Sequence, residues 1–353
     1  MPRSNGACEP QLLSLRVWSL CSATGEAAMV RGPPGIYPVD ILEDDPAGHR
    51  EAALAYCATL GEGAWPSPEV ISLPTGEQVK LEASSVCFCT VHCDEPQHKI
   101  LVLVNPQDTK TVVAVYVKES WWTTEDVLRT SDPAREGLMK VQSFGERIVL
   151  FILNVVIFGR LERNLDDDDM FFLPHSVKEE AKILWRDGAA VGFYTTKRKG
   201  SLCGDGTGVC YLLPVLDTVF VRRNHRRQGL GLAMLRDFCQ TFQEDEALGI
   251  SWPISLPFCR KFLAAHPEER GRLWEAEPPG AWGQRVNIWL KVQLQQARRP
   301  DCESGFWLCG QPCYRHTGRL QRVCGGFLMD GVCAQVVGLR AGGASRVADT
   351  HCL

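Results

Sequence analysis

The sequence predicts an α/β protein: a mixed sheet with flanking helices, preceded by a smaller α/β region, between irregular termini. Short runs of β-branched and aliphatic residues alternate with longer segments in which apolar residues recur every three or four positions. Hydrophobic residues make up 45% and charged residues 23% of the 353 positions, which is typical of a globular protein with an ample core. A chain of this length can form one large domain or two of ordinary size.

The net charge and the cysteines narrow the class of protein. A net charge of −4 does not identify a nucleic-acid binder. Arg16 interrupts the apolar patch at 12–21 and no good cleavage site follows, so we expect no signal peptide. The longest apolar run, 148–158, is too short to cross a bilayer. We therefore expect the 16 cysteines to be mostly free thiols in a reducing intracellular compartment.

The first half of the chain is expected to hold a small α/β region at 36–135. Residues 1–35 lack periodicity and end in Arg31-Gly-Pro-Pro-Gly35, which indicates an irregular segment and a linker. A helix at 46–60 precedes a largely antiparallel sheet, with strands expected at 70–73, 78–81, 86–91, 100–104 and 111–117. A hydroxyl-and-acid helix start follows Trp122. Residues 136–169 are expected to form one long helix, 136–163, and a solvated acidic loop at 166–169.

The second half, 170–297, has clearer signals. Two strands, 181–185 and 189–196, flank the tight-turn pair Asp187-Gly188. A long strand at 210–221 leads into a helix that includes 232–242, and further elements follow in the order strand 248–252, helix 258–265 and strands 273–275 and 285–290. The tail at 298–353 is rich in cysteine and glycine, lacks clear periodicity and is expected to be disordered.

One stretch combines a strand, a basic turn and two glycines at the start of a helix. The strand carries Val219 and Val221, and the glycines are Gly229 and Gly231. This arrangement gathers backbone N–H groups at a positive helix end, which suits a pyrophosphate. Glycine lets such a ligand approach the backbone where a Cβ would interfere. The simpler alternative is an ordinary strand-to-helix turn with a solvated basic run.

The spacing Arg226-Arg-Gln-Gly229-Leu-Gly231 resembles the pyrophosphate loop of GNAT-type N-acetyltransferases, Arg/Gln-x-x-Gly-x-Gly/Ala. The order of elements over 176–294 is also similar to the core of that family. The resemblance implies acetyl-CoA as ligand and substrate, with its thioester in a slot between the Val219 strand and the strand near Ile250. It implies these cofactor-binding residues: Val219, Val221, Arg226, Arg227, Gln228, Gly229, Leu230, Gly231 and Leu232.

Catalytic groups are harder to find in this sequence. In GNAT enzymes an amine attacks the thioester directly, so the protein positions the partners and removes a proton. Many members carry a tyrosine that protonates the departing thiolate, but Phe262 stands at that position and cannot donate a proton. Asp217 is the nearest acid and is the candidate catalytic residue, acting through water, although such an Asp more often hydrogen-bonds within a sheet or loop. An N-acetyltransferase and a catalytically inactive relative both stay open.

Three other groups of residues suggest chemistry but have simpler interpretations. The basic run 222–227 is compatible with nuclear import or nucleic-acid binding, but a phosphate ligand would use the same charges. Cys87, Cys89 and Cys93, with the imidazole of His92, are zinc-ligand types. The three cysteines share one face of a strand, which favours a cysteine-lined core. The tail cysteines at 309 and 313 have no second ligand pair at zinc spacing.

Longer strings are more specific than the glycine loop. Trp121-Trp-Thr-Thr-Glu-Asp-Val, Phe144-Gly-Glu-Arg-Ile-Val-Leu and Leu213-Pro-Val-Leu-Asp-Thr resemble the soluble lamin-associated protein family, and the similarity covers about 36–294. That resemblance implies a nuclear or nuclear-envelope location and lamin-linked partners, with a cytoplasmic location as the alternative. It implies no demonstrated acetyl transfer. The second functional hypothesis is therefore a catalytically inactive GNAT fold that acts as a nuclear interaction protein.

Overall fold

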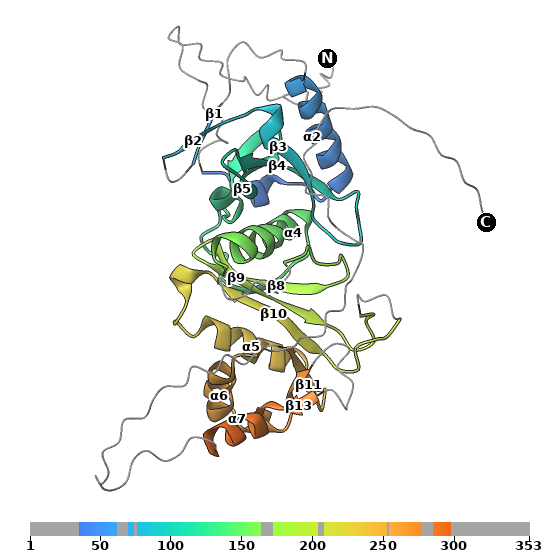
Figure 1. The fold of residues 1–353 in the computed structure, drawn as a ribbon, viewed down its shortest axis with the longest axis vertical. Helices are drawn as coiled ribbons and strands as arrows, with labels where there is room; N and C mark the ends of the chain where they lie inside the picture. Colours follow the sequence, from blue (N-terminus) through green and yellow to red (C-terminus); the bar gives the residue numbers. More distant parts are fainter. Residues whose placement is uncertain are drawn as a thin grey trace, which may run out of the picture.

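The computed structural model describes residues 35–61, 70–73, 76–163, 172–203, 208–252, 254–276 and 285–297. The protein is a mixed α/β structure with a seven-stranded mixed sheet, a four-stranded sheet, a two-stranded hairpin and flanking helices, which confirms the predicted fold class. Figure 1 shows the small sheet and the large sheet on opposite sides of a central helix. The expected irregular N-terminal segment, acidic loop and cysteine-rich tail lie outside the described residues.

The N-terminal region has the predicted helix and strands. Its helices and strands are α1 (Pro38–Ile41), α2 (Pro46–Gly61), β1 (Val70–Ser72), β2 (Gln78–Lys80), β3 (Val86–Thr90), β4 (Lys99–Asn105), β5 (Asp108–Val117) and β6 (Ser120–Thr123). Strands β3 to β6 pair antiparallel in chain order. Side chains of β4 alternate between two cores, since Leu101 and Leu103 lie in the cluster that includes Ala53 of α2, while Val102 lies in the central cluster. Helix α3 (Thr124–Val127) follows β6, and the Thr123 hydroxyl accepts its Asp126 N–H at 3.2 Å.

The expected long helix at 136–163 is wrong in its first part. Gly137–Lys140 forms β7, an edge strand of the large sheet, and Gly137 has a φ of 87°, which a right-handed helix does not contain. Helix α4 (Phe144–Phe151) begins after Ser143. The Ser143 hydroxyl accepts the Glu146 N–H at 3.2 Å, and the Glu146 carboxylate accepts the Ser143 N–H at 3.1 Å, which is a complete capping box. The chain then continues as a π-helix over Ile152–Leu161.

The large sheet has the strand order β13-β12-β11-β10-β9-β8-β7. Its further strands and helices are β8 (Glu180–Arg186), β9 (Ala189–Lys197), β10 (Val215–Val221), α5 (Leu230–Thr241), β11 (Leu248–Ser251), α6 (Leu256–Ala265), β12 (Leu273–Ala276), β13 (Arg285–Asn287) and α7 (Ile288–Ala297). Only the neighbours β10, β11 and β12 run parallel. Asp187 and Gly188 take φ angles of 49° and 71°, the left-handed values that the predicted tight turn requires.

Several strand boundaries shift by up to three residues, and the start of β10 and the end of the last strand bear on the site and on α7. Strand β10 begins at Val215 instead of residue 210. The last strand ends at Asn287, and residues expected to extend it to 290 start helix α7 instead. The Asn287 side chain accepts the Leu290 N–H at 3.0 Å, so a local polar cap stabilises the helix start over a longer strand.

Two apolar cores cover the two faces of the large sheet. On one face, α4 and the π-helix pack between the large and small sheets, with Ile148, Ile152 and Phe193 among the buried residues. On the other face, α5 and α6 bury Phe238 and Phe262. Figure 1 shows α5 below the large sheet and α4 above it. Among the helices in the described ranges, none combines the length and apolar character that crossing a bilayer requires.

Candidate functional site

A cavity of 430 Å³ lies where β10 ends and α5 begins. It brings together eight of the nine residues predicted to bind a cofactor: Val219, Val221, Arg226, Arg227, Gly229, Leu230, Gly231 and Leu232. The ninth, Gln228, is not among the lining residues, and its side-chain oxygen accepts a hydrogen bond from Arg186. We call this space the loop cavity. Its other walls come from the π-helix segment, through Phe158, and from α6, through Phe258 and Lys261.

The glycine loop has the backbone geometry of an anion site. Arg227 and Gly229 have φ angles of 65° and 81°, so the chain turns sharply through left-handed conformations before α5 starts at Leu230. No described side chain caps this helix. The N–H groups of its first turn have no intrahelical acceptor and lie at the positive end of the helix. Gly231 has a different role, because a Cβ there would lie 3.2 Å from the Phe258 ring, which would have to shift by a few tenths of an ångström.

Strand β10 has an open edge beside this loop. It pairs with β11 only at Val215 and Leu216, because the described part of β11 ends at Ser251. The Arg222 N–H donates to the Val191 carbonyl of β9 at 2.9 Å. In an antiparallel pair, every second residue forms hydrogen bonds to the neighbouring strand. The N–H and C=O groups of Val221 and Val219 therefore point away from β9, toward the open edge. This edge lies beyond the pairing of Leu216 with Ile250, at the place where the sequence predicts the thioester slot.

The basic run 222–227 is divided between structural and cavity roles. Arg222 makes two hydrogen bonds to Glu125, at 3.0 and 2.6 Å, and does not line the cavity. Arg226 donates to the Val221 carbonyl at 2.8 Å and pairs with Glu162 at 3.3 Å, so it braces the strand end. Arg227 and Lys261 line the cavity and form no ion pair with any residue in the described ranges. The free positive charge of the cavity therefore comes from these two side chains.

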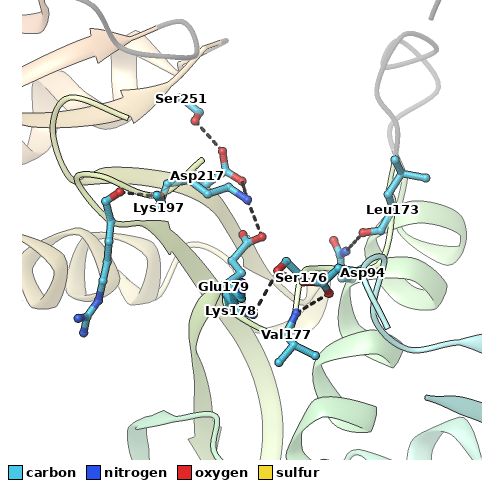
Figure 2. A network of polar contacts seen from close by, with 12 residues as sticks. Asp94, Leu173, Ser176, Val177, Lys178, Glu179, Lys197, Asp217 and Ser251 are labelled. Carbon is cyan, nitrogen blue, oxygen red and sulfur yellow. Dashed lines mark hydrogen bonds and ion pairs between the residues drawn. The ribbon is translucent and has the colours of Figure 1, made fainter. Parts of the chain in front are cut away.

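Asp217 lies at the irregularity in the β9–β10 pairing between Leu216 and Thr218, and it does not line the loop cavity. The Ser251 hydroxyl donates to its Oδ1 at 2.8 Å, and Lys197 Nζ is 3.7 Å from its Oδ2 (Figure 2). Asp217 instead lines a second cavity of 600 Å³ on the π-helix side of the sheet. We call this space the acidic cavity.

The acidic cavity contains functional groups that sequence reasoning missed. Glu179 accepts a hydrogen bond from Lys197 at 2.5 Å, and Asp94 accepts the Ser176 hydroxyl at 2.6 Å. Figure 2 shows the Ser251–Asp217–Lys197–Glu179 chain of contacts and the separate Asp94–Ser176 pair. Burial opposes the charged form of Lys197, but the two neighbouring carboxylates outweigh it and raise its pKa. No spacing rule joins residues 94, 179, 197 and 217, so only the fold could reveal this cluster.

Phe262 lies in the apolar core instead of at the loop cavity. Its side chain is 2% exposed and packs with Phe238 and Leu263. On the same helix, Phe258 and Lys261 line the cavity and Phe262 does not. The expectation that position 262 faces the departing thiolate is therefore not met by the geometry.

Comparison with known proteins gives several relatives, among them one from Mus musculus and one from Homo sapiens. The Mus musculus protein named Protein FAM169B is 75% identical over 269 residues, which cover 75% of this chain and 80% of that protein. The chain belongs to the FAM169B family. The Homo sapiens protein named Protein FAM169BP is 82% identical over 117 residues, which are 33% of this chain and 61% of that protein. No family model matches the chain.

This family membership corrects the resemblance inferred from the sequence strings. The relatives carry the name FAM169B, which mentions neither lamins nor acetyltransferases, so the assignment to the soluble lamin-associated protein family is wrong. Short identical strings indicated that family, but a match along 80% of a relative decides the family membership. The lamin-linked partners and the nuclear location rested on that resemblance and stay predictions.

Two of the three cysteines expected on one strand face pack against the core, and the third does not. Cys87 and Cys89 are half-buried on β3 and contact the central apolar cluster. Cys93 lies beyond the end of this strand and is exposed. In the described part of the chain, no three His, Cys, Asp or Glu side chains come together as a metal site. The tail cysteines at 309 and 313 lie outside the described residues.

Proposed function

We propose that this chain binds an acyl-CoA, with acetyl-CoA as the simplest ligand. The observation that carries the proposal is the loop cavity itself. Eight residues chosen from sequence spacing line one space between an open strand edge and an uncapped helix start. The pyrophosphate would bind the first-turn N–H groups of α5, and the pantetheine arm would lie along the open edge of β10.

The charges and the backbone of the cavity support this ligand. Arg227 and Lys261 supply two cations that form no ion pair with described residues, and the helix end adds positive potential for the two phosphates. The peptide group of Val219 is directed to the open edge, where it would pair with a pantetheine amide as a neighbouring strand would. A cavity of 430 Å³ lies in the size range of small-molecule sites.

Acyl transfer is the reaction that this binding mode would serve. An amine nitrogen would attack the thioester carbonyl carbon, a C–N bond would form, the C–S bond would break, and a proton would pass to the departing thiolate. The acceptor is an ammonium ion before the reaction, and Asp217, which follows the paired part of β10, would first remove one proton from it through water. The second candidate is acyl-CoA binding without turnover, because none of the described residues that line the loop cavity carries a phenolic donor for the thiolate.

Calorimetric titration of the full chain with acetyl-CoA and with CoA tests the proposal. A ligand at about 100 times its Kd should stabilise the fold by about 2.7 kcal/mol, which a parallel thermal-unfolding series would detect. Release of free CoA thiol over a panel of amines then separates transfer from binding alone. A folded chain that binds neither ligand at millimolar concentration would refute the proposal.

A further inference from the structure

We propose that the acidic cavity binds an alkylammonium ion, the protonated form of a primary amine or of a lysine side chain. In the proposed function this ion is the acyl acceptor, and that role rests on acyl-CoA binding. The binding itself depends on separate residues and is measured without CoA. The cavity is outside the glycine loop, and its ligand class follows from its own charges and walls.

A buried carboxylate oxygen without a partner points to a missing donor. The Glu179 side chain is 3% exposed, and its Oε1 is buried with no hydrogen-bond partner within the described structure. Its other oxygen accepts the Lys197 ammonium at 2.5 Å. A buried carboxylate oxygen without a donor is costly, so a ligand N–H group is its natural complement.

The charges of the cavity call for a cation. Glu179, Asp217 and Asp94 bring three negative charges to this region. The positive charges are those of Lys197 and of Arg147, whose guanidinium donates to the Glu179 backbone carbonyl at 3.0 Å, which leaves one negative charge. Asp94 lines the same cavity and already accepts the Ser176 hydroxyl and the Val177 N–H, at 2.6 and 2.9 Å. Burial lowers the pKa of the lining His175, so this imidazole adds no charge near neutral pH. An ammonium with three donors matches this set.

Part of the cavity wall is apolar and fits an aliphatic stem. Phe158, Phe172, Leu173 and Pro174 line it, and the whole space measures 600 Å³. A hydrated inorganic cation would gain nothing from these walls, whereas a carbon chain would bury apolar surface against them. The combination of a carboxylate end and an aromatic wall therefore favours an alkylammonium ion over a metal ion.

The two cavities adjoin along β10. Asp217 and Thr218 line the acidic cavity, Val219 lines the loop cavity, and Phe158 lines both. A thioester on the open edge would thus lie within one or two residues of the bound amine. The ammonium would lose one proton through Asp217 to solvent. The free nitrogen would attack the carbonyl carbon, the C–S bond would break, and the second nitrogen proton would go to the thiolate.

The test is calorimetric titration of the full chain, with and without saturating CoA, using butylamine and a short lysine-containing peptide as probes. The variants are Glu179→Gln, Lys197→Gln and the control Glu180→Gln. Glu180 is the next residue on the chain, and its carboxylate pairs with Lys140 and Arg198 at the surface instead of lining the cavity. Circular dichroism and thermal unfolding check that each variant is folded.

We expect Glu179→Gln to weaken amine binding by roughly tenfold to a hundredfold, the usual effect of losing a charge-assisted hydrogen bond. Glu180→Gln should leave it unchanged. Lys197→Gln should tighten amine binding severalfold, because it removes the competing cation, and a partly unfolded variant cannot mimic this gain. If butylamine binds, a small primary amine is enough to occupy the cavity. If the peptide binds and butylamine does not, the ligand is a lysine side chain in a peptide. Both results support the proposal.

Two results would overturn it: no binding of either probe at millimolar concentration, or equal affinities of the wild type and Glu179→Gln. Failure of acyl-CoA binding is a separate result, because the titrations without CoA report on the acidic cavity alone.

Discussion

Replacement of Gly229 by glutamate, compared with replacement by glutamine, isolates the electrostatic part of the proposed pyrophosphate site. Gly229 has a φ of 81°, and an added Cβ would meet no atom within 4 Å. Any other residue therefore pays a conformational cost of about 1 to 2 kcal/mol without a steric clash. Glutamate and glutamine share this cost and almost the same shape. The difference between the two variants is a single negative charge beside the first turn of α5.

The size of that difference follows from Coulomb's law. A carboxylate about 5 Å from one phosphate charge, at an effective dielectric constant of about 20, is repelled by about 3 kcal/mol. This energy corresponds to a Kd about a hundredfold weaker for the glutamate variant than for the glutamine variant. Salt reduces the gap, because the Debye length is about 10 Å at an ionic strength of about 0.1 M.

Isothermal titration with acetyl-CoA at low and at high salt measures the effect. Thermal unfolding without ligand should give similar melting temperatures, because the backbone strain is common to both variants. Gly229→Glu should be the slightly more stable one, since its carboxylate lies at the positive end of α5. Equal Kd values for Gly229→Glu and Gly229→Gln, in folded proteins, would refute the placement of the pyrophosphate at this loop. Loss of binding in both variants would instead indicate that the loop conformation matters more than its charge.

Three further predictions concern stability. Arg272→Ala is expected to lower the free energy of unfolding by about 2 to 4 kcal/mol, because the Arg272 guanidinium donates to both carboxylate oxygens of Glu269 at 2.9 and 2.8 Å. The control Arg198→Ala removes an exposed ion pair and should lower it by less than about 1 kcal/mol, so equal losses in urea unfolding would contradict the prediction. Ser143→Ala should cost about 1 kcal/mol through the lost cap of α4, and an unchanged midpoint would argue against it. Burial lowers the pKa of His92 to about 4 in the folded protein, below the value of about 6.5 in the unfolded chain. The free energy of unfolding should therefore be highest above about pH 6.5 and fall below it, because the unfolded imidazole then takes up a proton that the folded one does not. His92→Asn should flatten this pH profile, and an unchanged profile would contradict the prediction.

Much of the fold could be predicted because its signals are local. The helix at Pro46–Gly61 and the strands of the small sheet follow from runs of apolar residues between turn residues. The start of α4 was missed although its signal is present, since Ser143 and Glu146 have the spacing of a capping box. Strand β7 was missed for another reason. Four residues at a sheet edge carry too little periodicity to compete with the long apolar run that follows them.

The loop cavity and the acidic cavity also differ in how far they could be predicted from the sequence. The loop cavity could be predicted because its residues are nearly contiguous, and one strand-turn-helix unit holds them together. The acidic cavity could not, because Asp94, Glu179, Lys197 and Asp217 come from four separate segments that meet only in the folded chain. Phe262 shows a third limit. Its helix was predicted correctly, but the side-chain direction depends on packing against Phe238, which spacing alone does not give.

The position of Phe262 also changes how inactivity should be judged. Because this side chain lies in the buried cluster that includes Phe238, a tyrosine there would lie in the core instead of at the loop cavity, and its absence removes no donor from the site. The amine itself carries a proton that the thiolate can take once the C–N bond has formed. A general acid contributes roughly a hundredfold to ten-thousandfold to such a step. Transfer without one is therefore expected to be slow, not absent, and a turnover assay must detect rates lower by that factor before the chain is classified as a binding protein alone.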